Sequence, residues 1–397
     1  MNRLKYNHFM HPDYLLQPDN RQIVHIDLDT FFVSVERLQN SALKEKPVII
    51  GGLSDRGVVA GCSYEARRFG VHSAMPMRMA RQLCPQAVYI RGDMDTYSHY
   101  SHVVTDIIAE KVPVYEKASI DEHYLDLTGM DKYFGCYKFS HELRQTIIRE
   151  TGLPISFGLS VNKTVSKIAT GEAKSGVSRE LYVERDQVKP FMDPLSISKI
   201  PMLGPKTFRL LRSMGVDKIA TLSQLPPDVM ERVLGKNGID LWRKANGIDL
   251  TPVERYYERK SIGSEQTFEA DTTDMRFLSE WLVRMTEKLA FELRTRGKLT
   301  SCVVVKIRYS DFDTHTIQKR IPYTSFDHVL IREAKELLQR LYTRRVLVRL
   351  IGVRFTHLVS GSQQLNLFED TPEQVNLYLA MDRIRKRFGA DAVGRAV

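Results

Sequence analysis

The sequence has little cysteine and no long hydrophobic run. Its four cysteines are spread through 397 residues and form no CxxC pair: Cys62, Cys84, Cys136 and Cys302. This spacing argues against a disulfide framework and against a cysteine-based zinc site. No apolar run is long enough to cross a membrane, and the polar stretch 1–20 lacks the apolar core of a signal peptide. We therefore expect a cytoplasmic protein without a membrane partner.

The composition is that of a multidomain globular protein with a basic surface. Short-period repeats and low-complexity tracts are absent, hydrophobic residues make up 43%, and the length predicts two to four domains. The net charge of +10 favours a polyanionic partner. Residues 254–360 hold 20 Lys and Arg against 14 Asp and Glu, a net charge of +6. A solvated basic face explains this excess as well as nucleic-acid contact does.

Two predicted strands carry carboxylates where buried strands normally carry none. Asp27 and Asp29 interrupt the β-branched run that starts at Ile23, and in an extended chain they share one face. Asp121 and Glu122 lie at or near a turn between predicted strands 114–119 and 123–127. Neighbouring side chains of a straight strand point to opposite faces, so only a bend lets both reach one ion. Carboxylates from two strands predict a divalent-metal site with hard oxygen ligands.

The order of predicted elements indicates an α+β fold. A run of predicted elements follows the ferredoxin-like order. It consists of strand 21–29, helix 95–110, the two strands around the acidic pair, a helix ending at Gly152, strand 155–161 and a helix from Asn162 to about Lys174. Between strand 21–29 and helix 95–110, the pattern predicts strands 46–52 and 58–62 and helices 64–69 and 76–84. Tyr64 and Arg67 are three residues apart and share one helical face.

The second half offers two places for DNA contact. The turn 200–206 contains Gly204 and Lys206 and lies between predicted helices, where exposed amides suit a phosphate; an ordinary helical turn fits equally well. After a charged linker at 254–260, a helix is followed by a strand with one apolar side, and its other side carries Lys306 and Arg308. That basic face suits a duplex, although solvation alone also explains it. Helix 329–341 and strand 346–355 follow.

Taken together, these motifs resemble those of Y-family (translesion) DNA polymerases, most closely the bacterial DinB or DNA polymerase IV branch. The resemblance rests on five motifs in family order over about residues 21–360: Asp27-Leu28-Asp29-Thr30-Phe31-Phe32, Tyr64-Glu65-Ala66-Arg67, Ser119-Ile120-Asp121-Glu122, Asn162-Lys163 and Leu203-Gly204. It implies a right-hand polymerase with an N-terminal extension (1–20), a ferredoxin-like palm (21–30 and 93–177), small fingers (31–92), a helical thumb with a helix-hairpin-helix (178–253), a linker (254–263), an α+β little finger (264–360) and a tail (361–397).

The resemblance also implies roles for particular residues. Asp27, Asp121 and Glu122 would be the catalytic carboxylates that hold two Mg²⁺ ions, with the main-chain carbonyl of Leu28 as a further ligand. Phe32 would be the steric gate that excludes a ribonucleotide 2′ hydroxyl, and the adjacent Phe31 a core residue.

Three residues match those that bind the dNTP triphosphate in the family. These are Tyr64, Arg67 and Lys174, since arginine offers a bidentate fork to phosphate and lysine a point charge. The chain departs from the family in having Ser175-Gly176 where Pro-Asn-Gly usually follows the lysine.

Several acidic and histidine positions have more than one interpretation. For Asp29 and Asp126 we expect structural hydrogen bonds rather than metal ligation. His123 stands where the family usually has a small residue, and contact with the primer end, contact with a neighbouring base and simple packing all fit it.

The C-terminal segment carries a second interaction motif. Gln364-Leu365-Asn366-Leu367-Phe368 resembles the pentapeptide with which bacterial polymerases bind the sliding clamp, through Gln364, Leu365, Leu367 and Phe368. From Thr371 onward we expect an amphipathic helix whose apolar side is Leu377, Met381, Ile384 and Phe388, docked on the body rather than on DNA.

The sequence favours a monomeric, distributive polymerase acting on primer–template DNA with dNTPs and a clamp. A two-metal nuclease leaves the triphosphate set and Phe32 without a role. A non-catalytic clamp- or DNA-binding paralogue does not need the three carboxylates. Within the family, a UmuC-like polymerase subunit that depends on accessory proteins is the alternative.

Overall fold

The computed structural model describes residues 21–130, 135–255, 258–361, 371–389 and 392–394, and it forms two compact units that meet at residues 256/257. This boundary falls inside the predicted linker. Ser261–Gly263 already belong to a strand, so the linker prediction of 254–263 is three residues too long. The four cysteines are buried, and among the described residues none of them forms a disulfide. Within the described residues, no helix is long and apolar enough to cross a membrane.

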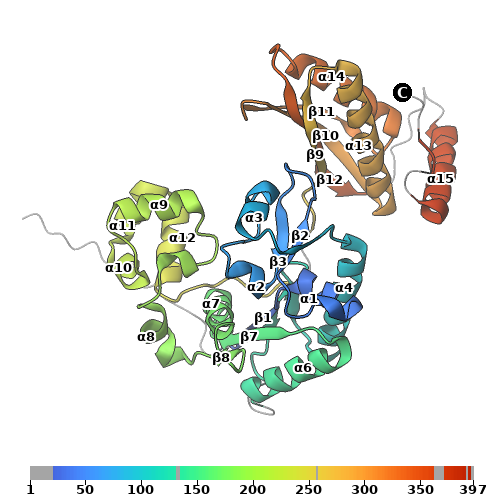
Figure 1. Cartoon of the computed structure of the whole chain (residues 1–397). Coiled ribbons are helices and arrows are strands. Elements are labelled where there is room, and N and C mark those ends of the chain that lie inside the picture. Colours follow the sequence, from blue (N-terminus) through green and yellow to red (C-terminus); the bar gives the residue numbers. More distant parts are fainter. Residues whose placement is uncertain (1–20, 131–134, 256–257, 362–370, 390–391, 395–397) are drawn as a thin grey trace, which may run out of the picture. The chain divides into compact units, whose positions relative to one another are not determined.

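The N-terminal unit is built on a five-stranded sheet in the order β5-β6-β1-β7-β8 (Figure 1). The strands are β1 (Ile23–Leu28), β5 (Tyr115–Lys117), β6 (Glu122–Asp126), β7 (Ile155–Ser160) and β8 (Glu180–Tyr182). The central strand β1 pairs antiparallel with β6 and β7, as in the predicted ferredoxin-like palm. Its alternate residues Val24, Ile26 and Leu28 are buried in one core, whereas His25 and Asp27 point to the other face.

Helices cover both faces of this sheet. α4 (Met94–Lys111) and α6 (Cys136–Thr151), both predicted as helices, pack on the apolar face. α7 (Lys163–Ala173) packs on the other face after Asn162, which accepts a hydrogen bond from the Val165 amide as the predicted N-cap. Gly158 of β7 permits the close approach of α7, since a Cβ there would lie 2.5 Å from the Thr170 amide nitrogen.

A smaller three-stranded sheet, in the order β3-β2-β4, follows β1 in the chain. It consists of β2 (Val48–Gly51), β3 (Val59–Cys62) and β4 (Val88–Ile90), and the sequence pattern did not predict β4. Helices α1 (Phe31–Gln39), α2 (Tyr64–Arg67) and α3 (Met77–Leu83) accompany it, together with the 3-10 helix η2 (Ser41–Leu43). Ser63 is the N-cap of α2, because its side chain accepts a hydrogen bond from the Ala66 amide.

The remainder of the N-terminal unit is helical. It contains η3 (Arg185–Gln187), α8 (Val188–Met192), η4 (Ile197–Lys199), α9 (Pro205–Ser213), α10 (Ile219–Gln224), α11 (Pro227–Leu234) and α12 (Lys236–Ala245). The predicted glycine turn precedes α9, but the element before it is the three-residue η4 rather than a full helix.

The C-terminal unit is a four-stranded antiparallel sheet in the order β11-β10-β12-β9, with α13 and α14 packed on one face (Figure 1). The elements are β9 (Ser261–Thr272), α13 (Met275–Thr295), β10 (Lys298–Tyr309), β11 (Thr314–Thr324), α14 (Asp327–Leu341) and β12 (Val348–Ser360). The residues on the predicted apolar side of β10 are buried in the core: Val303, Val305, Ile307 and Tyr309. The sequence analysis missed β9 and β11, which are the two edge strands.

The last helix, α15 (Thr371–Phe388), docks on the C-terminal unit as expected, but through the opposite face. The predicted apolar side is exposed: Leu377 is 56% and Phe388 68% accessible. The buried positions are instead Tyr378, Asp382 and Arg385. Polar contacts to α13 and α14 decide this orientation, and they form a network that a hydrophobicity pattern does not reveal.

Candidate active site

The two acidic motifs meet at the centre of the larger sheet. Asp27 of β1 lies directly opposite Glu122 of β6 in the antiparallel register. Asp121 immediately precedes β6, and its main-chain carbonyl accepts a hydrogen bond from the Leu28 amide at 3.0 Å. The bend 119–121 places the acidic pair at a turn-to-strand junction, as the sequence predicts. The fold therefore brings all three predicted catalytic carboxylates to the same end of the β1–β6 strand pair.

Two lysines pair with two of these carboxylates: Lys167 of α7 and Lys174, the C-cap residue of that helix. Lys174 Nζ lies 2.5 Å from Asp27 Oδ1, and Lys167 Nζ lies 2.5 Å from Glu122 Oε2. The lysines are seven residues apart, which places them on one side of the helix. Sequence analysis identified Lys174 but missed Lys167, whose only signal was this two-turn spacing.

The pKa values of Asp27 and Glu122 are shifted in opposite directions. Burial raises the pKa of Asp27 to about 6, because Lys174 offsets only part of the cost and the Glu122 and Asp121 carboxylates add to it. Burial would also raise the pKa of Glu122, but its cationic partners bring it to about 2. The important partner is Lys167, since His25 Nε2 is 3.7 Å away and burial lowers the pKa of that histidine.

The three carboxylates have the right chemistry for a divalent cation, but they are not arranged as a closed ligand cluster. Among the described residues, no group of three His, Cys, Asp or Glu side chains is placed to hold a metal ion. Asp121 Oδ1 instead accepts a hydrogen bond from Ser119 Oγ at 2.6 Å. The raised pKa of Asp27 shows that nearby positive charge only partly offsets the burial of its carboxylate. A bound cation would provide the missing positive charge.

The predicted triphosphate residues are connected to the same edge of the sheet. The Arg67 guanidinium carbon lies 5.2 Å from the centre of the Tyr64 ring. Arg179 donates a hydrogen bond to the Tyr64 hydroxyl at 3.1 Å and another to Asp29 Oδ2 at 3.2 Å. Lys174 Nζ is 4.0 Å from Asp29 Oδ1. Lys174 thus lies beside Asp29, and Arg179, which the sequence did not predict, links Asp29 to Tyr64, whose ring Arg67 approaches.

Phe32, the predicted steric gate, lies in the first turn of α1. Its ring stacks on Tyr97 at 4.5 Å between centroids, and a Cβ on Gly61 would lie 3.3 Å from its Cδ2. Tyr97 is fully buried and donates a hydrogen bond to Glu36 Oε1 at 2.5 Å, so the stacking partner is itself fixed. Phe31 is a core residue, as predicted.

The remaining acidic and histidine side chains pack or form structural hydrogen bonds. Asp29 accepts hydrogen bonds from Ser156 Oγ at 3.0 and 2.9 Å, and Asp126 accepts one from the Thr128 amide. His123 is fully buried against α4, with Nε2 3.0 Å from Thr105 Oγ1. This placement favours the packing interpretation of His123 over direct contact with a primer or base.

Of the predicted DNA-contact residues, Gly204 and Lys206 are exposed, whereas Lys306 and Arg308 are half-buried. Gly204 is the N-cap of α9, no side chain caps that helix, and Lys206 lies in its first turn. This leaves first-turn amides available for a phosphate. On the outer face of β10, Lys306 pairs with Glu265 at 2.8 Å, and Arg308 donates a hydrogen bond to Thr314 at 2.9 Å. The predicted clamp residues Gln364, Leu365, Leu367 and Phe368 lie outside the described residues.

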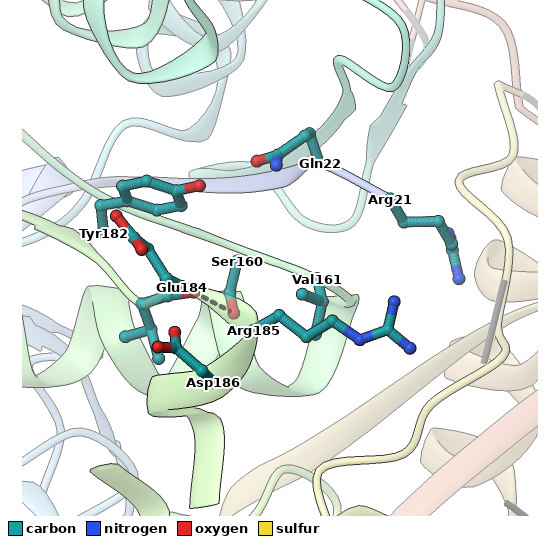
Figure 2. A pocket seen from close by; sticks show the side chains of 9 residues that line it. Arg21, Gln22, Ser160, Val161, Tyr182, Glu184, Arg185 and Asp186 are labelled. Atoms are coloured by element: carbon teal, nitrogen blue, oxygen red, sulfur yellow. Dashed lines mark hydrogen bonds between the residues drawn. The ribbon is translucent and has the colours of Figure 1, made fainter. Parts of the chain in front are cut away.

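A cavity of about 410 Å³ opens at the other end of the larger sheet (Figure 2). Its walls come from the start of β1 and the ends of β7 and β8, and they include Arg21, Gln22, Ser160, Tyr182 and Arg185. Asp27 is near the end of β1, so this cavity does not belong to the carboxylate site.

Comparison with known proteins agrees with this geometry. The impB/mucB/samB family matches residues 26–171, and the C-terminal domain of that family matches residues 259–367. Relatives called DNA polymerase IV are 38% identical in Dehalococcoides mccartyi (94% of this chain, 96% of the relative) and 37% identical in Listeria innocua (85% and 96%).

A solved structure gives the same result for the fold. The Y-family DNA polymerase chimera Dbh-Dpo4(243-245)-Dbh superposes with a TM-score of 0.75 and 26% identity, over 86% of this chain and all of the other. The paired carboxylates, the motif order, the relatives and this fold lead to one conclusion: the chain belongs to the impB/mucB/samB family and is a Y-family DNA polymerase related to bacterial DNA polymerase IV.

Proposed function

We propose that the chain is a template-directed DNA polymerase of the translesion type, which adds dNTPs to a primer 3′ end. The observation that carries this proposal is the pairing of Asp27 opposite Glu122, with Asp121 beside them and Lys174, one of the predicted triphosphate residues, paired with Asp27. A nuclease would need the carboxylates alone. The additional grouping of Tyr64, Arg67 and Lys174 favours transfer of a nucleotide from a triphosphate.

Membership of the family implies dependence on a divalent metal, and we propose two Mg²⁺ ions as the cofactor. Asp27, Asp121 and Glu122, together with the Leu28 carbonyl, would hold them. Bound ions would lower the pKa of the primer hydroxyl and neutralise the leaving pyrophosphate. The chain's own contribution is a partly buried set of carboxylates, two of which are paired with lysines that ions would have to displace.

The neighbouring residues would select and hold the nucleotide. Arg67 is exposed and interacts with the Tyr64 ring and the Cys62 thiol rather than with a carboxylate, so its guanidinium can pair with a triphosphate. Lys174 borders both Asp27 and Asp29 and can exchange a carboxylate for a phosphate partner. Phe32, fixed on Tyr97, would contact the sugar and exclude a 2′ hydroxyl.

The DNA and clamp contacts complete the proposal. The first turn of α9, with Gly204 and Lys206, and the outer face of β10, with Lys306 and Arg308, would bind the phosphate backbone without reading sequence. Segment 364–368 would bind a sliding clamp, which raises the local concentration of primer ends for a monomeric polymerase of low processivity.

The test is primer extension by the purified chain on an undamaged primer–template with Mg²⁺ and dNTPs. Asp121→Ala should abolish extension, whereas Asp126→Asn, a control carboxylate at the other end of β6, should retain it. Loss of activity in both variants would point to damage to the sheet rather than to chemistry. DNA binding without extension by the wild type would move the assignment to an accessory-dependent subunit or a non-catalytic paralogue.

A further inference from the structure

We propose that Arg179 positions Tyr64 for the incoming nucleotide by linking its hydroxyl to the buried carboxylate of Asp29. This inference rests on the proposed function, because it treats Tyr64 as part of the nucleotide site. Arg179 lies between α7 and β8, in the segment where the chain departs from the family sequence. Its role therefore comes from the contacts in this structure and not from a motif.

The backbone holds Arg179 in an unusual conformation. Its φ is 61°, a left-handed value that non-glycine residues seldom adopt. Its carbonyl accepts a hydrogen bond from the Phe157 amide at 3.0 Å, which fixes the residue at the edge of β7. Such a conformation persists only where surrounding contacts determine it, and here they direct the guanidinium toward the nucleotide site.

Asp29 provides a rigid anchor for this guanidinium. Its side chain is 3% exposed, and Ser156 Oγ donates to both of its carboxylate oxygens. Its own amide donates to the Pro154 carbonyl at 2.8 Å. Arg179 is its closer cation at 3.2 Å, since Lys174 is 4.0 Å away and pairs with Asp27. A buried carboxylate of this kind requires a partner, and Arg179 supplies it.

Tyr64, by contrast, has little local support. It lies on the four-residue helix α2, of whose residues only Ala66 is buried. Among the described residues, the hydrogen bond from Arg179 is the one that its hydroxyl makes. The same guanidinium lies 5.3 Å from the centre of the Tyr64 ring. One nitrogen, Nη1, thus joins the buried carboxylate of Asp29 to the hydroxyl of Tyr64.

The arrangement also divides the work between two arginines. Arg67 and Arg179 both approach the Tyr64 ring, at 5.2 and 5.3 Å. Asp29 neutralises Arg179, whereas Arg67 forms no ion pair among the described residues. Arg179 is therefore committed to protein contacts, and Arg67 remains for the triphosphate. On this basis Arg179 is a positioning residue, and its removal should weaken nucleotide binding more than it slows chemistry.

The test compares Arg179→Ala, Tyr64→Phe and the double variant in single-nucleotide insertion on a fixed primer–template. Each single variant should raise the KM for dNTP by about 5- to 10-fold, the effect of one charge-assisted hydrogen bond, with kcat within about twofold of wild type. The double variant should be no worse than the worse single variant, because both changes remove the same link. Arg149→Ala, a mostly exposed arginine on α6, is the control and should match wild type.

Arg179→Lys keeps a positive charge beside Asp29 but loses the guanidinium that donates to both Asp29 and the Tyr64 hydroxyl. It should keep the thermal unfolding midpoint of wild type and still raise the KM, which separates positioning from simple charge compensation. If Arg179→Ala is too unstable to assay, Arg179→Lys and Tyr64→Phe form the same cycle. An unchanged KM in the Arg179 variants, or effects that multiply in the double variant, would overturn the proposal. A wild-type chain that neither extends primers nor binds dNTP would instead overturn the proposed function.

Discussion

The Lys174 ammonium lies 2.5 Å from the Asp27 carboxylate, yet it offsets only part of the cost of burying that charge. Burial raises the pKa of Asp27 to about 6 despite this contact. The site therefore contains a carboxylate whose charged form is disfavoured in the folded protein. This is the condition under which binding of a divalent cation both completes the site and stabilises the fold.

Replacing Asp27 by Asn should stabilise the metal-free chain above pH 6. A folded-state pKa of about 6, against the ordinary 3.8, means that the folded state binds the extra proton, so stability falls as pH rises from about 4 to 6. The difference corresponds to about 3 kcal/mol at most. Urea unfolding in EDTA at pH 8 and pH 4 measures it, and the gain should be present at pH 8 and absent at pH 4. Equal stability of the two proteins at pH 8 would contradict the expectation.

Removing the lysine partner of Glu122 should have the opposite pH dependence. Glu122 has a pKa of about 2, below its ordinary value, so its ionisation stabilises the fold above about pH 4.5, and this contribution is lost as pH falls toward 2. Lys167→Met should cost about 1–2 kcal/mol at pH 7, since both side chains are partly exposed, and less as pH falls below 4.5. Lys167→Arg is the control that keeps the charge. A cost that is constant with pH would show that lost packing, rather than lost charge, is responsible.

The sequence reveals the carboxylates of this site more readily than the cationic side chains that pair with them. Asp27 and Glu122 could be predicted because carboxylates are exceptional in apolar strands. Lys167 and Arg179 could not, since their partners depend on how α7 and the segment before β8 lie on the sheet. The edge strands β9 and β11 are mostly exposed and lack a clear apolar alternation.

The aromatic gate should be separable from the core aromatic beside it. Phe32→Ala should lower discrimination against ribonucleotides by about 100-fold or more while dNTP insertion is retained, because the ring would no longer contact the 2′ hydroxyl. Phe31→Leu should reduce stability by about 1 kcal/mol without changing sugar selectivity. Competition between dCTP and CTP opposite a template dG measures both. Unchanged selectivity in the Phe32 variant would remove the gate assignment.

The docking of α15 should depend on charge rather than on its apolar side. Arg294 Nε and Asp382 Oδ2 are 2.7 Å apart, both are nearly buried, and Arg294 also pairs with Asp327. Asp382→Ala leaves Arg294 with one of its two carboxylates and should weaken docking by about 3 kcal/mol, the lower end for breaking a buried ion pair. The control is Leu377→Ala, on the exposed side, which should change it by less than about 0.5 kcal/mol. Amide hydrogen exchange of α15 provides the measurement, and the two variants should differ by about 100-fold in protection. Equal protection in both, or faster exchange in the Leu377 variant, would show that the apolar side, not the Arg294–Asp382 pair, holds the helix.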